Sequence, residues 1–279
     1  KTFDKSLADR TLTVEDIETT YGDASAPTNF VITPSEGNMD SCTYEVVHDL
    51  DSYNSNFAAT ITVDANTGEI TYHNAGIAYV KITMTDPLGV YDDAVAYAKV
   101  TVKRKAISVS SYAYLTGDDS KTPIDTVKYG ELDTLSYGLK YGGADEMPAD
   151  MALVGSLEAI PLNETLGVGA DARIAIGQIE GAVVIDGVTY NTFISRNYLI
   201  TYVPNAITIT PTELWITAEE TVGAYGNEPQ YIYHFGRVDG SQNLAPWDTE
   251  AVILDKVVLA DDQKYDALKP GVYDEIIVT

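Results

Sequence analysis

The chain has 279 residues, of which 17 are Lys or Arg and 42 are Asp or Glu, so its formal net charge is −25. This length leaves room for two or three domains of about 100 residues, each able to bury its own core. The negative charge argues against nucleic-acid binding and against adsorption on anionic membranes, and it is typical of a soluble surface whose copies repel one another.

Cys42 is the only cysteine, which excludes an intrachain disulfide and a disulfide-stapled ectodomain. Tyr44, Val46 and Val47 follow it in a predicted strand, so we interpret Cys42 as a small core or edge residue. His48 lies too far along the same strand to hydrogen-bond the thiol as a catalytic base. A lone thiol fits a cytosolic protein or a bacterial surface protein.

No stretch approaches the ~20 consecutive apolar residues of a membrane helix, and no signal peptide opens the chain. Lys1 stands where an initiator methionine is expected, and residues 275–279 stop inside a predicted strand. Both observations lead us to expect an excised fragment. Because no stretch is long and apolar enough, we expect no membrane insertion within it.

Val, Ile, Thr and Tyr dominate the periodic segments, so the fold is predicted to be mainly β. In residues 1–105 the strands are predicted at residues 59–63, 69–72, 78–84 and 94–102. Asn66-Thr67-Gly68 supplies the turn of a hairpin between the first two, and Asp86-Pro87-Leu88-Gly89 a turn between the last two. Short antiparallel strands in this order predict a β-sandwich.

The basic run Lys103-Arg104-Lys105 follows the last of these strands, and we interpret it as a junction between domains. The second predicted domain covers residues 106–211. Its strands are predicted at residues 107–109, 135–141, 182–185, 198–203 and 206–209. Apolar residues with partial helical spacing predict a helix over residues 149–159. The third predicted domain, residues 212–279, opens with a strand at residues 214–217.

One pattern occurs three times, as Tyr21-Gly22-Asp23, Tyr129-Gly130-Glu131 and Tyr225-Gly226-Asn227. The copies lie 108 and 96 residues apart, which is the spacing of domains rather than of solenoid repeats. Glycine lets the backbone turn sharply, the tyrosine is expected to pack over the turn, and the polar residue is expected to cap it through backbone amides. We interpret the motif as structural; contact with a ligand is the alternative.

Residues 214–229 contain an apolar strand, an acidic pair, and then Tyr225-Gly226-Asn227 shortly before Pro229. This order resembles the opening of the MBG-type repeat of bacterial surface adhesins. Residues 196–209 contain Asn197-Tyr198 before a strand, a small turn and a final Ile-Thr-Ile strand, which resembles the closing segment of the same repeat.

The first domain has the Tyr21-Gly22-Asp23 copy, but its second half differs from this repeat. Residues 61–64, 68–71 and 75–82 are similar instead to a bacterial Ig-like domain. The resemblances imply an Ig-like β-sandwich over residues 1–105, then MBG-like β domains over residues 106–211 and 212–279, the last of them truncated. They also imply a location on the surface of a bacterium or outside it, and a non-catalytic role in adhesion or as a stalk. Short linkers predict an elongated arrangement, and we expect a monomer.

Two other functions stay open. The chain could bind carbohydrate or mucin, with a host or environmental glycoprotein or glycan as partner, or it could comprise accessory domains of a larger secreted carbohydrate-active enzyme. Trp247 is the first candidate for a binding aromatic residue. Tyrosines that alternate on one strand could stack on sugar rings or pack across strands, namely Tyr112 with Tyr114 and Tyr231 with Tyr233. Trp215, in an apolar strand, is expected in the core.

His48, His73 and His234 form no closely spaced pair, so we interpret them as isolated polar positions rather than zinc ligands. Adjacent carboxylates are plentiful, but nothing in the sequence marks a cleft of the kind a glycosidase needs. No phosphate-binding loop, nucleophile elbow or metalloprotease helix motif is found. We therefore predict no enzyme, and we assign no catalytic, cofactor-binding or metal-ligating residue.

Structural calcium is the one cofactor left open. Carboxylates that could supply hard oxygen ligands gather at Gly117-Asp118-Asp119-Ser120 and at Asp86 with Asp92 and Asp93. No EF-hand spacing is present, and a solvated acidic loop explains the same residues.

Overall fold

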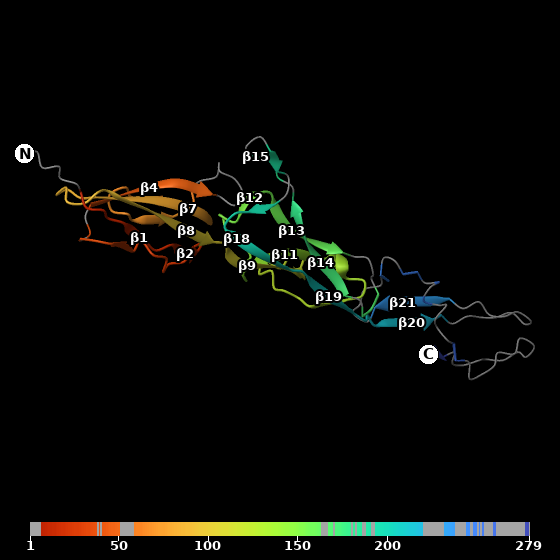
Figure 1. The fold of residues 1–279 in the computed structure, drawn as a ribbon. Coiled ribbons are helices and arrows are strands. Elements are labelled where there is room, and N and C mark those ends of the chain that lie inside the picture. Colours follow the sequence, from red (N-terminus) through yellow and green to blue (C-terminus); the bar gives the residue numbers. More distant parts are fainter. Residues whose placement is uncertain are drawn as a thin grey trace, which may run out of the picture. The chain divides into compact units, whose positions relative to one another are not determined.

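The structure is a computed structural model. It describes residues 7–37, 39, 41–50, 59–162, 167–169, 171–179, 181, 183–185, 188–190, 193–219, 232–237, 244–245, 248–249, 251, 253, 259–260 and 277–278. Strands make up most of these residues, which confirms the predicted mainly-β class (Figure 1). Within the described ranges, no helix is long and apolar enough to cross a membrane.

The chain divides into two compact units. The first unit comprises Lys1–Ser111, Gly138–Ile160 and Ile176–Pro204. The second unit comprises Tyr112–Tyr137, Pro161–Ala175 and Asn205–Thr279. The three-domain division predicted from the sequence, at residues 1–105, 106–211 and 212–279, stays a prediction.

The first unit contains a four-stranded sheet in the order β2-β8-β7-β4 (Figure 1). Its strands are β2 (Ile17–Thr20), β4 (Ser41–Leu50), β7 (Gly76–Thr85) and β8 (Ala94–Lys103). β7 is antiparallel to β4 and β8, whereas β2 runs parallel to β8. Every second residue of β7 is buried, which is the period-two alternation that predicted this strand.

Two pairs of short antiparallel strands accompany this sheet, β1 (Leu12–Val14) with β3 (Ile32–Pro34) and β5 (Ile61–Val63) with β6 (Ile70–Tyr72). Ile61 and Ile70 join Val80 and Val100 of the sheet in one buried core. Cys42 is half-buried against the same core, as predicted. The hairpin and the strands predicted in this part of the chain are confirmed.

The turn between β5 and β6 shows which residues determine the hairpin. The Asp64 carboxylate accepts hydrogen bonds from the backbone amides of Asn66 at 2.9 Å and Thr67 at 2.7 Å. The Thr67 and Asn66 amides hold the pKa of Asp64 below its ordinary value. Gly68 has a φ of 72°, and a Cβ placed there would lie 2.6 Å from the ring of Tyr44. Glycine is therefore needed at this position both for its backbone conformation and for space.

The first unit also contains most of a second set of strands. β9 (Lys105–Leu115) runs parallel to β18 (Tyr198–Val203) from its first residue to Ser110. Two antiparallel pairs accompany them, β12 (Ala152–Val154) with β17 (Ile194–Ser195) and β15 (Val183–Ile185) with β16 (Val188–Tyr190). Parts of β11 (Leu135–Tyr141) and β13 (Ser156–Leu162) also lie in the first unit, from Gly138 and up to Ile160. Val109, Leu139, Met151 and Leu157 are buried in their common core.

The helix predicted over residues 149–159 is wrong. These residues form a turn, then β12, then the beginning of β13. Gly155 separates the two strands with a φ of 67°, and a Cβ there would lie 2.3 Å from the carbonyl oxygen of Ile179. A left-handed residue packed against another backbone ends any right-handed helix. The apolar spacing therefore reflects two short strands that face one core.

In the second unit, β10 (Thr126–Lys128), β19 (Asn205–Thr210) and the first part of β14 (Asp171–Ile179), up to Ala175, are neighbours in that order. β10 is parallel to β19, and β14 is antiparallel to it. A short 3-10 helix, η1 (Leu132–Thr134), follows β10. β20 (Leu214–Ala218) pairs with β21 (Tyr233–Arg237), and β22 (Leu259–Ala260) pairs with β23 (Ile277–Val278), both antiparallel.

We predict that Gly68→Ala destabilises the protein more than Gly89→Ala. Both glycines have positive φ, 72° and 63°, so each substitution costs about 1–2 kcal/mol of backbone strain. A Cβ at Gly89 meets open space, whereas one at Gly68 must also displace the Tyr44 ring. Urea denaturation measures the difference in free energy of unfolding. Equal losses in the two variants would contradict the close packing at Gly68.

Candidate functional site

The first two copies of the Tyr-Gly pattern begin in the same way. In each, the strand before the tyrosine is parallel to the strand at the end of the predicted domain, β2 beside β8 and β10 beside β19. The Tyr21 amide donates to the carbonyl of Lys103 at 2.8 Å, and the Tyr129 amide donates to the carbonyl of Thr210 at 2.8 Å. Each tyrosine therefore extends a parallel ladder by one bond and stands at the edge where its domain ends.

Each copy then closes the same tight turn. The Asp23 amide donates to the carbonyl of Thr20 at 3.0 Å, and the Glu131 amide donates to the carbonyl of Lys128 at 3.1 Å. The glycine between has a φ of 72° in the first turn and 86° in the second. Positive φ at the third residue is what a type II turn requires, and glycine adopts it without strain. The predicted reason for the glycine is confirmed.

The acidic residue behaves differently in the two turns. Asp23 Oδ1 accepts bonds from the backbone amide and the hydroxyl of Ser25, at 2.9 and 2.7 Å, and the Ser25 amide is the main cause that lowers the pKa of Asp23. This is the cap that the sequence predicted. The Glu131 carboxylate instead forms an ion pair with the Arg237 guanidinium.

Both tyrosine side chains reach beyond their own turns, so the prediction that they pack over the turn is incomplete. The Tyr21 hydroxyl donates to the Asp150 carboxylate. The Tyr129 hydroxyl donates to Oδ1 of Asp248 at 3.1 Å. Each aspartate belongs to the domain predicted to follow. We call these contacts, with the residues packed around them, the first joint and the second joint; each lies within one compact unit.

The two accepting aspartates share a local sequence. Asp150 ends Met147-Pro-Ala-Asp, and Asp248 ends Ala245-Pro-Trp-Asp. Asp150 follows Tyr129 by 21 residues, and Asp248 follows Tyr225 by 23. Sequence analysis did not find this Pro-x-Asp pattern, although its recurrence at nearly constant distance from the Tyr-Gly motif is a usable signal.

In the first joint, Asp150 accepts from two tyrosines. Besides Tyr21, the Tyr198 hydroxyl donates to Asp150 Oδ1 at 3.1 Å, and the two rings meet edge to face with centroids 5.8 Å apart. Burial, followed by the bond to Asp150, raises the pKa of Tyr21 to about 12. Burial and the nearby Asp150 charge raise the pKa of Tyr198 as well. Both hydroxyls therefore keep their protons at neutral pH and act as donors.

Asn197 completes the first joint and is only 4% exposed. Its side-chain oxygen accepts from the Ala75 amide at 2.9 Å, and its side-chain nitrogen donates to Oδ1 of Asn74 at 3.2 Å. Its own carbonyl accepts from the Lys105 amide at 2.9 Å. The Asn197-Tyr198 pair, which the sequence singled out as part of a closing segment, thus contacts residues 1–105 through both side chains.

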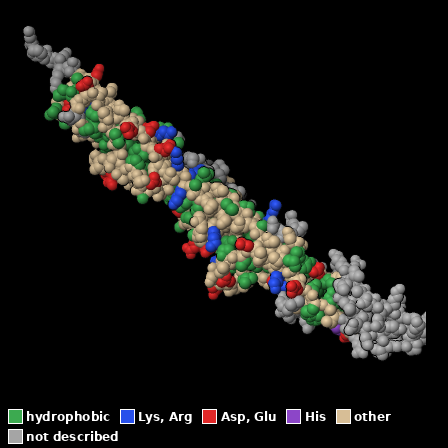
Figure 2. Space-filling view, turned by 90° about the horizontal axis from the view of Figure 1, so that it is seen from below, with side chains coloured by type: hydrophobic (Ala, Val, Ile, Leu, Met, Phe, Trp, Pro, Cys, Tyr) green, Lys and Arg blue, Asp and Glu red, His purple; other side chains and the backbone are tan. Residues whose placement is uncertain are grey.

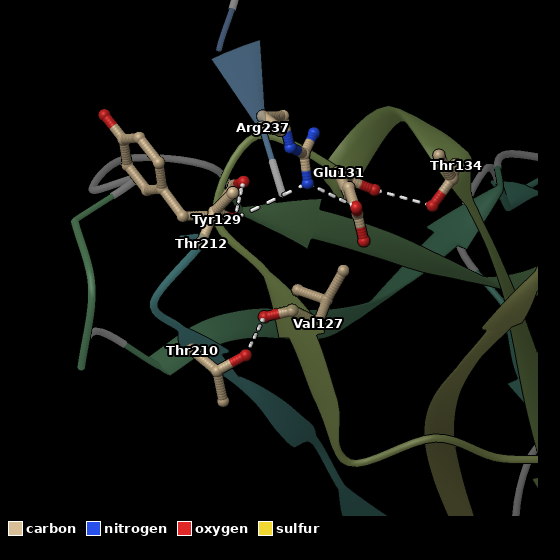
Figure 3. Close-up of polar contacts among 7 residues, drawn as sticks. All are labelled: Val127, Tyr129, Glu131, Thr134, Thr210, Thr212 and Arg237. Carbon is tan, nitrogen blue, oxygen red and sulfur yellow. Dashed lines mark hydrogen bonds and ion pairs between the residues drawn. The ribbon is translucent and has the colours of Figure 1, made fainter. Parts of the chain in front are cut away.

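The second joint surrounds a buried arginine (Figure 3). The Arg237 side chain is 9% exposed and contacts the Glu131 carboxylate and, at 3.5 Å, the Thr212 hydroxyl. Thr212 also donates to the carbonyl of Tyr129 at 2.7 Å. A Cβ at Gly130 would lie 3.1 Å from the Cβ of Ala245, so glycine also permits close packing here. The Tyr129 ring points away from Arg237 in Figure 3.

The aromatic residues considered for sugar binding differ in their exposure and packing. Tyr112 is 6% exposed and its ring lies 5.7 Å from that of Tyr114, which agrees with the packing alternative. The expectation that Trp215 is a core residue is wrong, because it is 37% exposed. It lies against Gly236, where a Cβ would come within 2.3 Å of the indole. Tyr231 and Trp247 lie outside the described residues, whereas Tyr233 is a half-buried residue of β21.

The acidic loops considered for calcium use their carboxylates as caps. Asp86 accepts bonds of 2.6–2.9 Å from three backbone amides in residues 88–91. Asp118 accepts bonds of 2.9 Å from the amides of Ser120 and Thr122. These amides lower the pKa of both aspartates. In the part of the chain that is described, no three His, Cys, Asp or Glu side chains gather as a metal site.

The histidines lie beside residues in or next to neighbouring strands, and the basic run lies between two strands. His73 Nε2 lies 2.9 Å from the Thr62 hydroxyl, and His234 Nε2 lies 2.7 Å from the Glu219 carboxylate. His48 is paired with Tyr79 across β4 and β7. The basic run Lys103-Arg104-Lys105 spans the change from β8 to β9, with a single residue between the two strands.

A comparison of the sequence with models of protein families finds no match, and a comparison with curated proteins finds none either. Among the described residues, the two joints are the contacts that recur with the same Tyr-Gly turn and the same Pro-x-Asp acceptor.

We predict that Tyr21→Phe lowers the free energy of unfolding by about 0.5–1.5 kcal/mol, because it keeps the ring and removes a hydrogen bond to a carboxylate that is itself exposed to water. Urea denaturation gives the value. Tyr97→Phe is the matched control, since Tyr97 is 60% exposed in the same unit and should change stability by less than about 0.5 kcal/mol. Equal effects of the two substitutions would contradict the joint.

The raised pKa of Tyr21 predicts alkaline weakening of the first joint. The folded protein holds this proton more tightly than the unfolded chain does, with a pKa of about 12 against 10.0. The contribution of Tyr21 is therefore complete below pH 10.0 and is lost as the pH rises to about 12. Urea midpoints across this range should fall more steeply for the wild type than for Tyr21→Phe. Parallel curves would show that Tyr21 titrates equally in both states.

Proposed function

We propose that the chain is a non-catalytic spacer of a bacterial surface or secreted protein, in which the joints hold successive β domains in sequence. The observation that carries this proposal is the repetition of one joint design. The tyrosine of a Tyr-Gly turn at one end of a predicted domain donates a hydrogen bond to the aspartate of a Pro-x-Asp tripeptide in the next, once through Tyr21 and once through Tyr129.

The energetics of tandem domains support a mechanical role. Stability in such chains is approximately the sum of each domain's own stability and the interaction with its neighbours. A hydrogen bond contributes about 0.5–1.5 kcal/mol and an aromatic pair about 0.5–1.5 kcal/mol beyond its burial. The first joint contains both, together with the buried Asn197. Only Arg104 separates β8 from β9, so the two predicted domains stay next to each other and the joint decides whether they move together.

The surface charge also suits a spacer. Acidic side chains are spread over the visible face in Figure 2 rather than gathered in one patch. With a net charge of −25, neighbouring copies repel one another at low salt, which opposes lateral aggregation. The resemblance to bacterial Ig-like and MBG-type domains supports the same role and an extracellular location.

The proposal predicts that Asp150→Ala frees residues 1–105 from the domain that follows. The substitution removes the acceptor of two tyrosine hydroxyls. Nitrogen-15 relaxation should give amides of β7 and of the first half of β9 a common rotational correlation time in the wild type and separate values in the variant. Asp119→Ala, in an exposed loop, is the control and should leave the common value unchanged.

Two results would count against the spacer. One is independent tumbling in the wild type. The other is saturable binding on a glycan and mucin array, which would favour the carbohydrate-binding alternative. Tyr97, 60% exposed on β8 and paired with Lys81 of β7, is the described aromatic residue best placed to stack on a sugar, so Tyr97→Ala should then abolish binding.

A further inference from the structure

The two joints share one contact and differ in a second. We propose that the shared contact, from the tyrosine to the Pro-x-Asp loop, recognises any following domain of this kind, whereas the second contact selects which domain follows. The partner of each turn is thus a β domain with two features, a Pro-x-Asp loop and a matching second group. This inference rests on the proposed function, because selection has a role only where joints keep domains in order.

The shared contact depends little on the surrounding sequence. Both turns have the same parallel strand pair, the same closing hydrogen bond and the same positive-φ glycine. Both place the tyrosine hydroxyl on an aspartate that ends a Pro-x-Asp tripeptide, Asp150 or Asp248. A domain that carries this tripeptide at the facing end satisfies the tyrosine whichever joint it enters.

The second contact of the first joint is an amide match. The Asn197 side chain accepts from the Ala75 amide and donates to the side-chain Oδ1 of Asn74, and Asn197 is only 4% exposed. A carboxylate in the place of Asn197 has no proton for Asn74, and a guanidinium has no acceptor for Ala75. Either exchange removes one of the two side-chain hydrogen bonds at this buried position, which disfavours a following domain that lacks asparagine there.

The second contact of the second joint is a charge match. The Arg237 side chain is 9% exposed and pairs with Glu131, whose side chain is 31% exposed. A following domain without this arginine leaves Glu131 partly buried and unpaired, which disfavours it. Asp23, the equivalent acid of the first turn, is one methylene shorter and caps its own turn through Ser25. The longer acid therefore reaches the next domain, and the shorter one does not.

The experiment uses the full chain and reverses the charge match. Glu131→Arg and Arg237→Glu, each alone, place like charges together, so each should lower the thermal midpoint by about 5 °C or more. The double variant restores the pair with opposite polarity and should recover at least half of that loss. Glu18→Lys with Lys103→Glu is the matched control, because this pair is 64% and 55% exposed and should change the midpoint by less than about 2 °C.

A double variant no more stable than the worse single variant would overturn the selection rule. Because Arg237→Glu could prevent folding, Glu131→Gln and Glu131→Asp are measured as well. An unchanged midpoint in both would also overturn the rule. Tyr129→Phe separates this failure from failure of the proposed function. If it lowers the midpoint while the Glu131 variants do not, the joint exists without selection; if it has no effect either, the second joint does not hold the domains.

Discussion

Each joint is positioned by the parallel pairing of a short early strand with the strand that ends its predicted domain. β2 lies beside β8, and β10 lies beside β19, each pair in the same direction. Parallel partners end at the same edge of a sheet. The residue after the early strand is therefore delivered to the point where the chain enters the next domain. An antiparallel partner in the same place would have carried Tyr21 or Tyr129 to the opposite edge, out of reach of Asp150 or Asp248.

The chemistry at that edge follows from the partial burial of the tyrosines. The tyrosine hydroxyls are partly removed from water and need an acceptor, and the exposed Asp150 carboxylate accepts from both of them. Burial, followed by the nearby Asp150, raises the pKa of Tyr21 and of Tyr198. The same hydroxyls would themselves be costly if buried without an acceptor. Tyrosine and aspartate thus stabilise each other only when the two predicted domains are together, so in the proposed spacer the contact couples the stabilities of those domains.

Much of the fold could be predicted from the sequence, and the failures have physical causes. β7 was predictable because a strand with one buried face alternates residue by residue, and the β5–β6 hairpin because Gly68 marks its turn. The helix over residues 149–159 failed because its apolar spacing also fits two strands, and only the packing of Gly155 against another backbone decides between them.

Only one side of each joint, the Tyr-Gly turn, could be predicted from the sequence. The sequence displays the Tyr-Gly turn and its glycine, because both are local. The hydroxyl acceptors lie 129 and 119 residues further along the chain, where no local rule points to them. Trp215 was misjudged for a related reason: its apolar strand is short, and the glycine that accommodates the indole sits on the partner strand.

The amide of Ala75 reports on the first joint directly, because it donates to the Asn197 side chain across the two predicted domains. Native-state hydrogen exchange of this single amide is therefore the most direct test of the account. The account predicts slow exchange in the wild type, a marked acceleration in Tyr21→Phe and in Asn197→Ala, and unchanged protection along β7. Exchange of the Ala75 amide at the rate of an open loop in the wild type, or no response to Tyr21→Phe, would contradict it.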